Sequence, residues 1–510
     1  MPINKRYLAA IAGIALATLF SFSYLNVSVV DVFLSFPNLI LFFGNNFLPP
    51  NFSGFTNNIP IILHTLLFAI VGTYISAILA FILGILMSVH MNPFPVLRGA
   101  VRFFVSFLRN VPLLIWAQFM VFIFGIGAII GVLALVMASL GFLARSYAES
   151  IDEIAGNKLE ALRSTGAGYW QILYHGLLPE FLPAWVNWTL FSFEINVRAS
   201  AILGMVGAGG LGLLIQTNLD LRGFRRAMAL ITVLIVMVLI TEFLVNYIRH
   251  LLEKEKLKKG KMSFTIPLMI FFTGLFFGSG YFLNLDFVTF ATRLGNAGHV
   301  ITRFMAFNPQ ALPEIIRQLM ISIALGICGL VIGSTVSLIL AFLAADNITF
   351  YKPLSKIIKG AVGLIRAIPS LVLILMIVAS LGFGYTTAVV GLTLSSAGYL
   401  TKAFISSIEE QDFAIIESMK ATGASWLQII IHGILPGVAS SFVSWISIRL
   451  ENNVGDSIAL GIVGAGGVGM LVSRAVRTNN FADLTTTVLV IFAAMALLEG
   501  FTKVVKNIFR

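Results

Sequence analysis

The chain has 510 residues, of which 58% are hydrophobic and 11% are charged, and its formal net charge is +11. Soluble globular proteins carry about 25% charged residues, so the composition excludes a soluble domain and makes lipid the solvent for much of the surface. The lysines and arginines gather in short segments between apolar runs, which is typical of cytoplasmic loops beside anionic lipid and gives no reason to expect a nucleic-acid partner. The single cysteine, Cys328, excludes an intrachain disulfide and a cysteine metal site.

The apolar runs are continuous and lack the alternation of barrel strands, so they predict membrane-spanning helices. We expect an all-α polytopic membrane protein with about 12 transmembrane helices in two parallel six-helix repeats. The first six spans are expected near 7–24, 61–88, 103–123, 125–145, 182–203 and 227–247, and the other six near 263–283, 315–344, 361–381, 383–403, 438–461 and 484–502. The first is interpreted as an uncleaved helix rather than a signal peptide. The segment 25–60 has no Lys or Arg and is expected to be an outer loop.

An internal repeat is the strongest signal in the sequence. Gly166 and Gly423 lie in matching Thr-Gly-Ala segments, at an offset of 423 − 166 = 257 residues. The same offset pairs Arg109 with Arg366, Pro112 with Pro369, Glu160 with Glu417, His175 with His432, Pro179 with Pro436, Glu194 with Glu451, Asn196 with Asn453 and Gly207 with Gly464. Because one register fits all these anchors without a gap, the chain is a tandem duplication.

The duplication divides the chain into a first permease-like repeat, 1–249, a lysine-rich linker, 250–262, and a second repeat, 263–510. The linker is short and positive and should be cytoplasmic. Both repeats then begin on the same side of the membrane, each crosses it an even number of times, and both chain termini should be cytoplasmic.

A polar segment separates the fourth and fifth predicted spans of each repeat. Its pattern predicts a helix, a turn at Gly166 or Gly423, a second short helix, and a proline that opens the next span. Such a helix–turn–helix along the membrane face could serve as a docking surface for a soluble partner, or it could be an ordinary connection between two spans.

This segment resembles the "EAA" loop of ABC importer permeases. The resemblance rests on Glu160, Ala161, Gly166, Leu178 and Pro179 in the first repeat and on Glu417, Gly423, Leu435 and Pro436 in the second, where Ser418 and Met419 replace the two alanines. In that family the loop docks into a groove on the ATPase subunit, so the resemblance implies a coupling role for these residues.

ATP chemistry is expected on another chain, because the sequence has no phosphate-binding loop of the G-x-x-x-x-G-K-[ST] type. The resemblance implies two copies of a cytoplasmic ABC ATPase that bring ATP and Mg²⁺, and an extracytoplasmic substrate-binding protein. It also implies a multi-pass protein of a bacterial-type inner membrane. We expect no catalytic residue, metal site or cofactor on this chain, which is a transport subunit rather than an enzyme.

A second pattern follows each polar segment, and it combines Glu-x-Asn with a glycine cluster. The cluster comprises Gly204, Gly207, Gly209, Gly210 and Gly212 in the first repeat and Gly461, Gly464, Gly466, Gly467 and Gly469 in the second. With Arg109 and Arg366, the pattern Glu-x-Asn-Val-Arg…Gly-Ala-Gly-Gly-x-Gly is similar to permeases of the phosphonate importer family. The resemblance implies import of phosphonate or a related phosphorus oxyanion, such as phosphite or phosphate.

The candidates for the substrate path are Arg109, Arg366, Glu194, Asn196, Arg198, Glu451 and Asn453. A charge at the centre of a membrane helix costs about 2.5–3.5 kcal/mol on insertion scales, so we expect the glutamates to face the protein interior. Other interpretations stay open: the glycines could serve helix packing alone, and the two arginines, expected where the third and ninth spans begin, could be interfacial anchors. Gly455 replaces Arg198 in the second repeat.

Five further arginines, Arg222, Arg225, Arg226, Arg474 and Arg477, follow the glycine clusters and are expected on the outer side. They could meet an anionic ligand or a binding protein, or snorkel to lipid phosphates. His175 and His432 are interpreted as structural.

Two other functions remain possible from the sequence. The first is an ABC permease for methionine or another amino acid, which the Glu-x-Asn-Val-Arg stretch argues against. The second is an ion-gradient-driven secondary transporter, which would favour inverted repeats or a proton relay rather than a parallel repeat with a docking loop.

Overall fold

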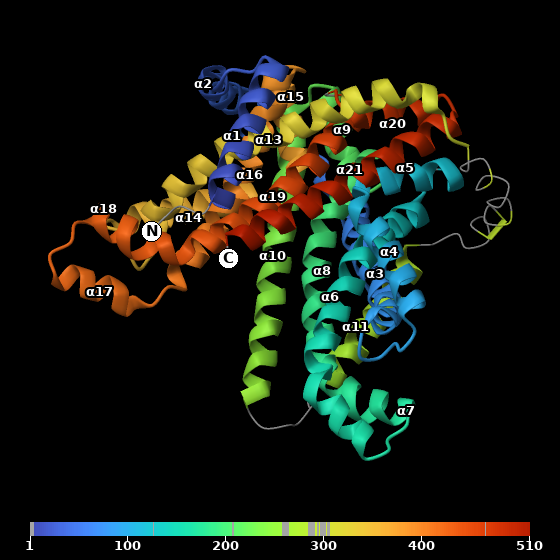
Figure 1. Ribbon diagram of the computed structural model, residues 1–510. Helices are drawn as coiled ribbons and strands as arrows, with labels where there is room; N and C mark the ends of the chain where they lie inside the picture. The colour runs from blue at the N-terminus through green and yellow to red at the C-terminus, as the bar shows by residue number, and fades with distance from the viewer. Residues whose placement is uncertain are drawn as a thin grey trace. The chain divides into compact units, whose positions relative to one another are not determined.

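The structure is a computed structural model that describes residues 5–125, 127–206, 209–257, 265–283, 291–292, 295, 302, 306–464 and 466–509. Its elements are helices (Figure 1). The first repeat contains α1 (Lys5–Leu25), α2 (Val29–Asn46), α3 (Phe55–Met87), α4 (Pro95–Asn110), α5 (Leu113–Phe124), α6 (Ala128–Ser164), α7 (Tyr169–Gln171), η1 (Ile172–Leu177), α8 (Leu178–Leu203), η2 (Gly204–Val206), α9 (Leu211–Asp220) and α10 (Phe224–Leu257). The second contains α11 (Thr265–Phe282), η3 (Pro309–Ala311), α13 (Leu312–Ala344), α14 (Lys352–Ala367), α15 (Ser370–Leu381), α16 (Tyr385–Glu409), α17 (Phe413–Ala421), α18 (Trp426–Gln428), η4 (Ile429–Ile434), α19 (Leu435–Ile462), α20 (Val468–Arg477) and α21 (Phe481–Ile508).

The offset found in the sequence also relates the helices. α3, α4, α5, α8, α9 and α10 each begin 257 residues (423 − 166) before α13, α14, α15, α19, α20 and α21. Backbone conformation follows the same register, because Arg222 and Asn479 are equivalent and both have positive φ, 56° and 51°. These six pairs of helices therefore share one local structure in the two repeats.

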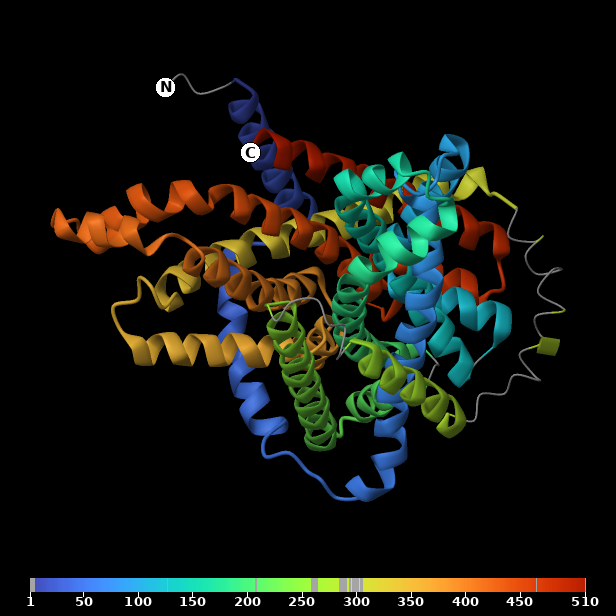
Figure 2. The same ribbon diagram turned by 90° about the horizontal axis from the view of Figure 1, so that it is seen from below.

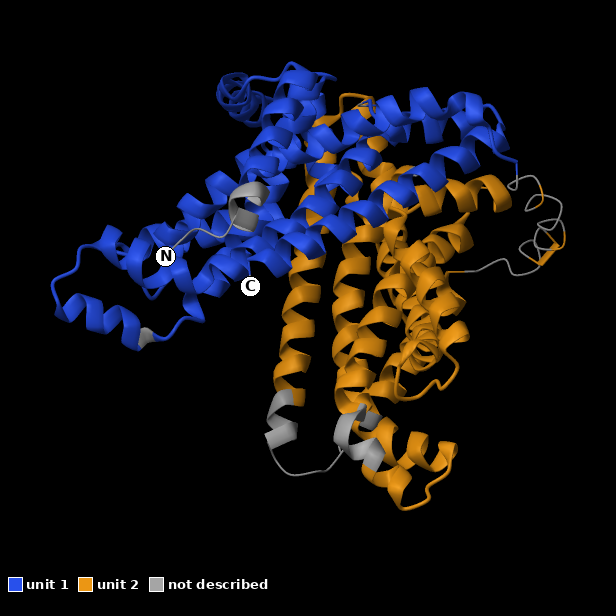
Figure 3. Cartoon of the chain, in the orientation of Figure 1, with its two compact units in different colours: residues 1–49, 306–510 blue, residues 50–305 orange. Residues whose placement is uncertain are grey.

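The helices form two compact units, coloured separately in Figure 3. Unit 1 contains residues 1–49 and 306–510, and unit 2 contains residues 50–305. Within unit 1, α1 packs on α13, and α2 packs on α15 and α16; within unit 2, α11 packs on α3 and α8. The first repeat therefore contributes α1 and α2, and the second repeat α11, to the unit built mainly from the other repeat. The division into repeats at 1–249 and 263–510 is a separate, sequence-based one.

The central bundle of unit 2 is α3, α6 and α8, which pack side by side (Figures 1 and 2). The corresponding bundle of unit 1 is α13, α16 and α19. Small residues allow these close approaches: a Cβ added at Gly72 would lie 2.9 Å from Cβ of Leu135, and one added at Gly329 would lie 2.5 Å from Cβ of Leu392. Small residues at helix contacts are typical of membrane bundles, where backbones must come close for packing to stabilise them.

The all-α polytopic class is confirmed. In the part of the chain that the structure describes, eight helices are long and apolar enough to cross a membrane, or ten if each of two bent pairs counts as one span. Shorter apolar helices, Ile11–Leu25 and Pro267–Phe282, occupy the first and seventh predicted spans. Residues 25–60, expected as an outer loop, contain α2, whose 18 residues meet the criteria for a span. α8 forms where the fifth span was predicted but is not among the eight, since Glu194, Asn196 and Arg198 interrupt its apolar sequence.

The third and ninth predicted spans are not straight. α4 and α5 meet at 96°, and α14 and α15 meet at 94°. Pro112 and Pro369 stand directly before α5 and α15. Proline lacks the N–H that would continue the preceding helix, and it disfavours the helical conformation of the residue before it. We refer to these two bends as the elbows.

Candidate functional site

The polar segments of the two repeats have the predicted glycine turn. The N–H of Gly166 donates to the Arg163 carbonyl at 3.0 Å and that of Ala167 to the Leu162 carbonyl at 3.2 Å. In the second repeat, Gly423 and Ala424 donate to Lys420 and Met419, both at 3.0 Å. This is the Schellman arrangement, in which the residue after the helix adopts a left-handed conformation. Gly166 and Gly423 have φ of +80° and +75°.

The short second helix is capped and then widens. The Gln171 side-chain oxygen accepts from the Gly168 N–H at 2.8 Å, and the Gln428 oxygen accepts from the Ser425 N–H at 2.7 Å. One turn later, η1 and η4 are π-helical in the same register. π-turns are rare and often lie at functional sites. The leucine–proline pairs, Leu178–Pro179 and Leu435–Pro436, begin the next helices.

Exposed apolar side chains cover this segment. In the first repeat, Trp170 is 64% exposed and stacks on Tyr174, which is 56% exposed. At the equivalent positions of the second repeat, Leu427 is 60% exposed and Ile431 51%. Large apolar residues that crowd one exposed surface are typical of a protein-binding site. We call these two surfaces the coupling surfaces.

The residues that carry the "EAA" resemblance lie on or beside the coupling surfaces. Ala161, Gly166 and Pro179 are exposed in the first repeat, and Glu417, Gly423 and Pro436 in the second. The side chain of Glu160 lies outside the described part of α6. His175 and His432 are exposed within η1 and η4.

An acidic residue joins the polar segment of each repeat to the preceding helices. Asp152 accepts from the Val89 N–H at 2.9 Å and lies 3.8 Å from the Arg102 guanidinium. At the equivalent place, Glu409 accepts from the Asp346 N–H and from the Lys359 ammonium, each at 2.8 Å. The route from span to coupling surface differs, because α6 is one helix of 37 residues, whereas α16 ends at Glu409 and α17 begins at Phe413.

The glycine clusters form tight backbone turns after α8 and α19. A Cβ added at Gly212 would lie 1.7 Å from the Ala201 carbonyl oxygen, and one at Gly469 would lie 1.9 Å from that of Ile458. Gly204 and Gly461 meet similar obstruction, and Gly209, Gly210, Gly464, Gly466 and Gly467 have positive φ. Gly207 lies outside the described residues. The clusters therefore require glycine for packing and for backbone conformation.

A hydroxyl on α3 holds the start of α9 in place, and one on α13 holds the start of α20. Thr65 Oγ1 accepts from the Leu211 N–H at 2.8 Å, and Ser322 Oγ accepts from the Val468 N–H at 3.1 Å. These bonds satisfy a backbone donor at the start of α9 and of α20, which would otherwise be left unpaired in an apolar setting.

The two asparagines of the Glu-x-Asn pattern are buried and bonded alike. Asn196 accepts from Ser139 Oγ at 2.8 Å and donates to Thr73 Oγ1 at 2.8 Å. Asn453 accepts from Ser396 Oγ at 3.0 Å and donates to the Gly326 carbonyl at 3.3 Å. Both asparagines join three helices within their own unit, and this bonding gives them a structural role, while their place in a substrate path stays a prediction.

The glutamates of the pattern differ in their partners. Glu194 is 7% exposed and forms an ion pair with Arg198, one turn later on α8. Glu451 accepts from Thr502 Oγ1 at 2.6 Å, and Gly455 stands where Arg198 would be. The interior position expected of Glu194 is confirmed, and the symmetric arginine is absent from the second repeat.

Arg109 and Arg366 lie at the elbows, not at the starts of spans, because proline ends α4 and α14 just after them. A Cβ added at Gly141 on α6 would lie 2.7 Å from the Arg109 backbone nitrogen, and one at Gly398 on α16 would lie 3.6 Å from that of Arg366. The elbows therefore pack directly against α6 and α16. Each arginine is half-buried there.

One polar group at the second elbow was missed by the sequence reasoning. Arg449 is 6% exposed, and its guanidinium lies 3.4 Å from the Asp456 carboxylate on the same helix. The Ser370 hydroxyl, at the start of α15, donates to the other oxygen of Asp456 at 2.9 Å. The signal was present, since Arg449 and Asp456 flank the Glu-x-Asn pattern within an apolar sequence.

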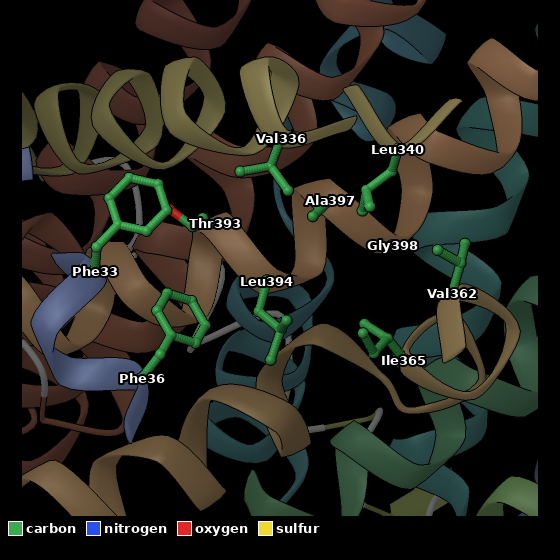
Figure 4. Close-up of a pocket in the computed structure, with 10 residues that line it drawn as sticks. All are labelled: Phe33, Phe36, Val336, Leu340, Val362, Ile365, Thr393, Leu394, Ala397 and Gly398. Carbon is green, nitrogen blue, oxygen red and sulfur yellow. The ribbon is translucent and has the colours of Figure 1, made fainter. Parts of the chain in front are cut away.

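A cavity of about 290 Å³ lies in unit 1 beside the second elbow (Figure 4). Phe33 and Phe36 of α2 face it on one side, and Val362 and Ile365 of α14 line it at another. Thr393, on α16, supplies a hydroxyl to an otherwise apolar wall. α2 therefore covers the elbow region in unit 1.

The arginines after the glycine clusters lie at or beyond the ends of α9 and α20. Arg477 donates to Ser473 Oγ at 3.0 Å, and the Arg225 carbonyl accepts from the Asn51 N–H at 2.9 Å. The Arg477 contact lies within α20, whereas the Arg225 contact is made by its backbone and ties the start of α10 to the segment before α3.

The family is decided by a match that occurs twice in the chain. The model of the family described as "Binding-protein-dependent transport system inner membrane component" matches residues 80–258 and again residues 337–509. The chain belongs to this family. It is a fusion of two such components in one chain. It is a transport subunit rather than an enzyme. It lies in a membrane, which it crosses several times.

Known relatives extend the match beyond these segments. "Phosphate-import permease protein PhnE" of Mycolicibacterium smegmatis is 30% identical over 85% of this chain and 82% of its own length. "Phosphite transport system permease protein PtxC" of Stutzerimonas stutzeri is 33% identical over 38% of this chain and 71% of its own length. "Probable D-methionine transport system permease protein MetI" of Vibrio cholerae is 26% identical over 34% of this chain and 81% of its own length.

Proposed function

We propose that this chain is the membrane-spanning permease of an ATP-driven, binding-protein-dependent importer that moves phosphonate or a related phosphorus oxyanion into the cell. The observation that carries the proposal is the 30% identity to a phosphate-import permease across both repeats. A phosphite permease is also a relative, at 33% identity. The methionine permease matches a smaller share of the chain at lower identity, so the phosphorus oxyanions are the better-supported class.

The coupling surfaces support two ATPase partners. Each repeat presents the same glycine turn, capped short helix and π-turn, followed by exposed apolar residues such as Trp170 and Leu427. One ATPase subunit would dock on each surface, bring ATP and Mg²⁺, and transmit its closure through α6 or through α16 and α17. This arrangement requires both surfaces to face the cytoplasm, and we place both chain termini on the same side as part of the proposal.

The residues Glu194, Asn196, Arg198, Glu451, Asn453, Arg109 and Arg366 remain the candidates for the substrate path. An extracytoplasmic binding protein would deliver the oxyanion to them. Conduction requires that any site on such a path release its ligand readily. Because Glu194 already pairs with Arg198, an oxyanion would compete with that carboxylate for the guanidinium, which favours weak, transient contact.

Reconstitution tests the substrate class. The chain is placed in proteoliposomes with its ATPase and binding protein, and ATP hydrolysis and uptake are measured with phosphate, phosphite, methylphosphonate and methionine. We expect at least one phosphorus compound, and not methionine, to stimulate both. Stimulation by methionine alone would refute the proposed substrate, and uptake that needs no ATP would refute the importer.

A further inference from the structure

The second repeat holds a charge pair for which the first has no equivalent. Arg449 and Asp456 lie on α19, within an apolar helical stretch long enough to span a membrane. At the equivalent positions of α8 stand Ser192 and Ala199. Ionisable residues within a membrane are costly and commonly mark a pathway for an ion or substrate, so an unrepeated pair needs a reason of its own.

The guanidinium of Arg449 is held mainly by hydroxyl groups. Its Nη2 donates to Ser395 Oγ at 2.8 Å and its Nε to Ser396 Oγ at 3.3 Å. The guanidinium carbon lies 5.6 Å from the centroid of the Tyr399 ring. The contact with Asp456, at 3.4 Å, is longer than the roughly 2.7–2.9 Å of a strong charge-assisted hydrogen bond. Asp456 is therefore a loose partner.

The carboxylate of Asp456 is the more accessible member of the pair. Its side chain is 24% exposed, against 7% for Arg449. Its second oxygen accepts from Ser370, the first residue of α15 after the second elbow. The backbone of Arg366 lies close by, because a Cβ added at Gly398, the residue before Tyr399, would be 3.6 Å from its nitrogen; two arginines therefore lie beside this elbow.

We infer that Arg449 is an oxyanion-binding, specificity-determining residue, and that Asp456 is an internal competitor that keeps its binding weak. This inference rests on the proposed function. A guanidinium offers parallel N–H groups that fit two oxygens of a phosphorus oxyanion as well as those of a carboxylate. The incoming anion takes the place of Asp456 on Arg449, and the return of Asp456 releases it.

The test uses the whole permease–ATPase complex in nanodiscs, with radiolabelled phosphate as the probe and phosphite and methylphosphonate as competitors. We expect Arg449→Gln to weaken binding about tenfold, because a charge-assisted contact is lost. Asp456→Asn should tighten binding about tenfold and slow turnover at saturating binding protein, since the competitor is gone. The double variant should bind as weakly as Arg449→Gln.

A purely structural pair gives a different pattern. Both single variants would then lose folded complex without opposite changes in affinity, and the double variant would recover wild-type behaviour; that result overturns the inference. If Arg449→Gln does not assemble, Arg449→Lys keeps the charge, loses the bidentate edge, and should still weaken binding. Ser192→Ala, at the first-repeat equivalent of Arg449, is the matched control and should leave affinity unchanged.

Failure of the proposed function is distinguishable from failure of this inference. If the wild-type transporter moves no phosphorus oxyanion in proteoliposomes, both are overturned. If it moves one while Asp456→Asn and Arg449→Gln leave its binding and its preference among the three anions unchanged, only the role of Arg449 is overturned.

Discussion

The coupling segments of the two repeats contrast a continuous helix with a broken one. In the first repeat α6 runs without interruption from Ala128 to Ser164, whereas in the second α17 starts anew after Asp412, which caps it by accepting from the Ala414 N–H at 2.9 Å. A continuous helix transmits displacement as one body, while a short capped helix can adjust separately. The helices that connect the spans to the two coupling surfaces are therefore expected to differ in stiffness, although the glycine turns are the same.

The buried charges show a second contrast. The first repeat keeps Glu194 and Arg198 as neighbours on one turn of α8, and the second repeat spreads Arg449, Glu451 and Asp456 along α19. The asparagines of the Glu-x-Asn pattern and the glycine clusters, which serve packing, occupy the same positions in both repeats. Duplication thus kept these packing residues, while the charged groups on α8 and α19 diverged.

The largest expected effect tests what the repeats share. Gly212→Ala and Gly469→Ala each place a Cβ within 2 Å of a carbonyl oxygen, at 1.7 and 1.9 Å. Because the obstacle is backbone, we expect each to cost about 3 kcal/mol or more and to reduce the yield of folded protein in detergent. Gly455→Ala, which meets nothing within 4 Å, is the control. Tolerance of one substitution but not the other would break the symmetry of the clusters.

Docking energies should separate the two coupling surfaces. Trp170→Ala removes an exposed indole, and Leu427→Ala removes a smaller side chain at the equivalent position. We expect losses of about 2 kcal/mol and about 1 kcal/mol in ATPase binding, since aromatic residues dominate protein interfaces. Titration of the ATPase subunit onto the permease in nanodiscs measures both. Leu221→Ala, exposed on the connection between α9 and α10 that is expected on the outer side, should change nothing.

The break before α17 predicts a local effect. Asp412→Ala removes the cap of α17 and should destabilise that helix by about 1 kcal/mol. Amide hydrogen exchange across Phe413–Ala421 should accelerate accordingly. Ala155→Ser, at the equivalent position within continuous α6, should leave exchange there nearly unchanged. Equal acceleration in both repeats would contradict the difference in stiffness.

The smallest expected effect concerns acid. Hydrogen bonding to Lys359 lowers the pKa of Asp346, although burial acts in the opposite direction. A carboxyl whose pKa is lowered by folding stabilises the folded state at pH values above its pKa in the unfolded chain, about 3.9. That stabilisation disappears as the pH falls through the lower pKa of the folded state. The protection of amides near Asp346, relative to their intrinsic exchange rates at each pH, should therefore fall below about pH 4. Asp346→Asn should flatten that fall, and Val89, its first-repeat equivalent, does not titrate. An unaltered pH profile in Asp346→Asn would refute a stabilising role for the Asp346–Lys359 ion pair.

The repeat, the helical class and the coupling turn were predictable from the sequence because each leaves a local pattern. Gly166 and Gly423 predict a left-handed turn at the end of a helix. A single offset of 257 residues aligns the matching residues of the two repeats. Within the described residues, the packing of α1 on α13 and of α11 on α3 was not foreseen, because partner choice depends on the shape of apolar faces and not on spacing. The elbows were missed because hydropathy averages across Pro112 and Pro369. The role of Arg449 was missed because its partners, Ser395 and Ser396, lie on α16, which is more than 50 residues away in the sequence.

Site-specific cross-linking tests most directly whether both repeats engage an ATPase. Cysteine replaces Trp170, Leu427 or both, in a background in which the buried Cys328 is changed to Ala. Reagents that couple exposed cysteines to the ATPase should capture one subunit with each single variant and two with the double variant, all from the cytoplasmic side. Capture at only one position, or labelling of the two positions from opposite sides of the membrane, would contradict the claim that one chain presents two equivalent coupling surfaces.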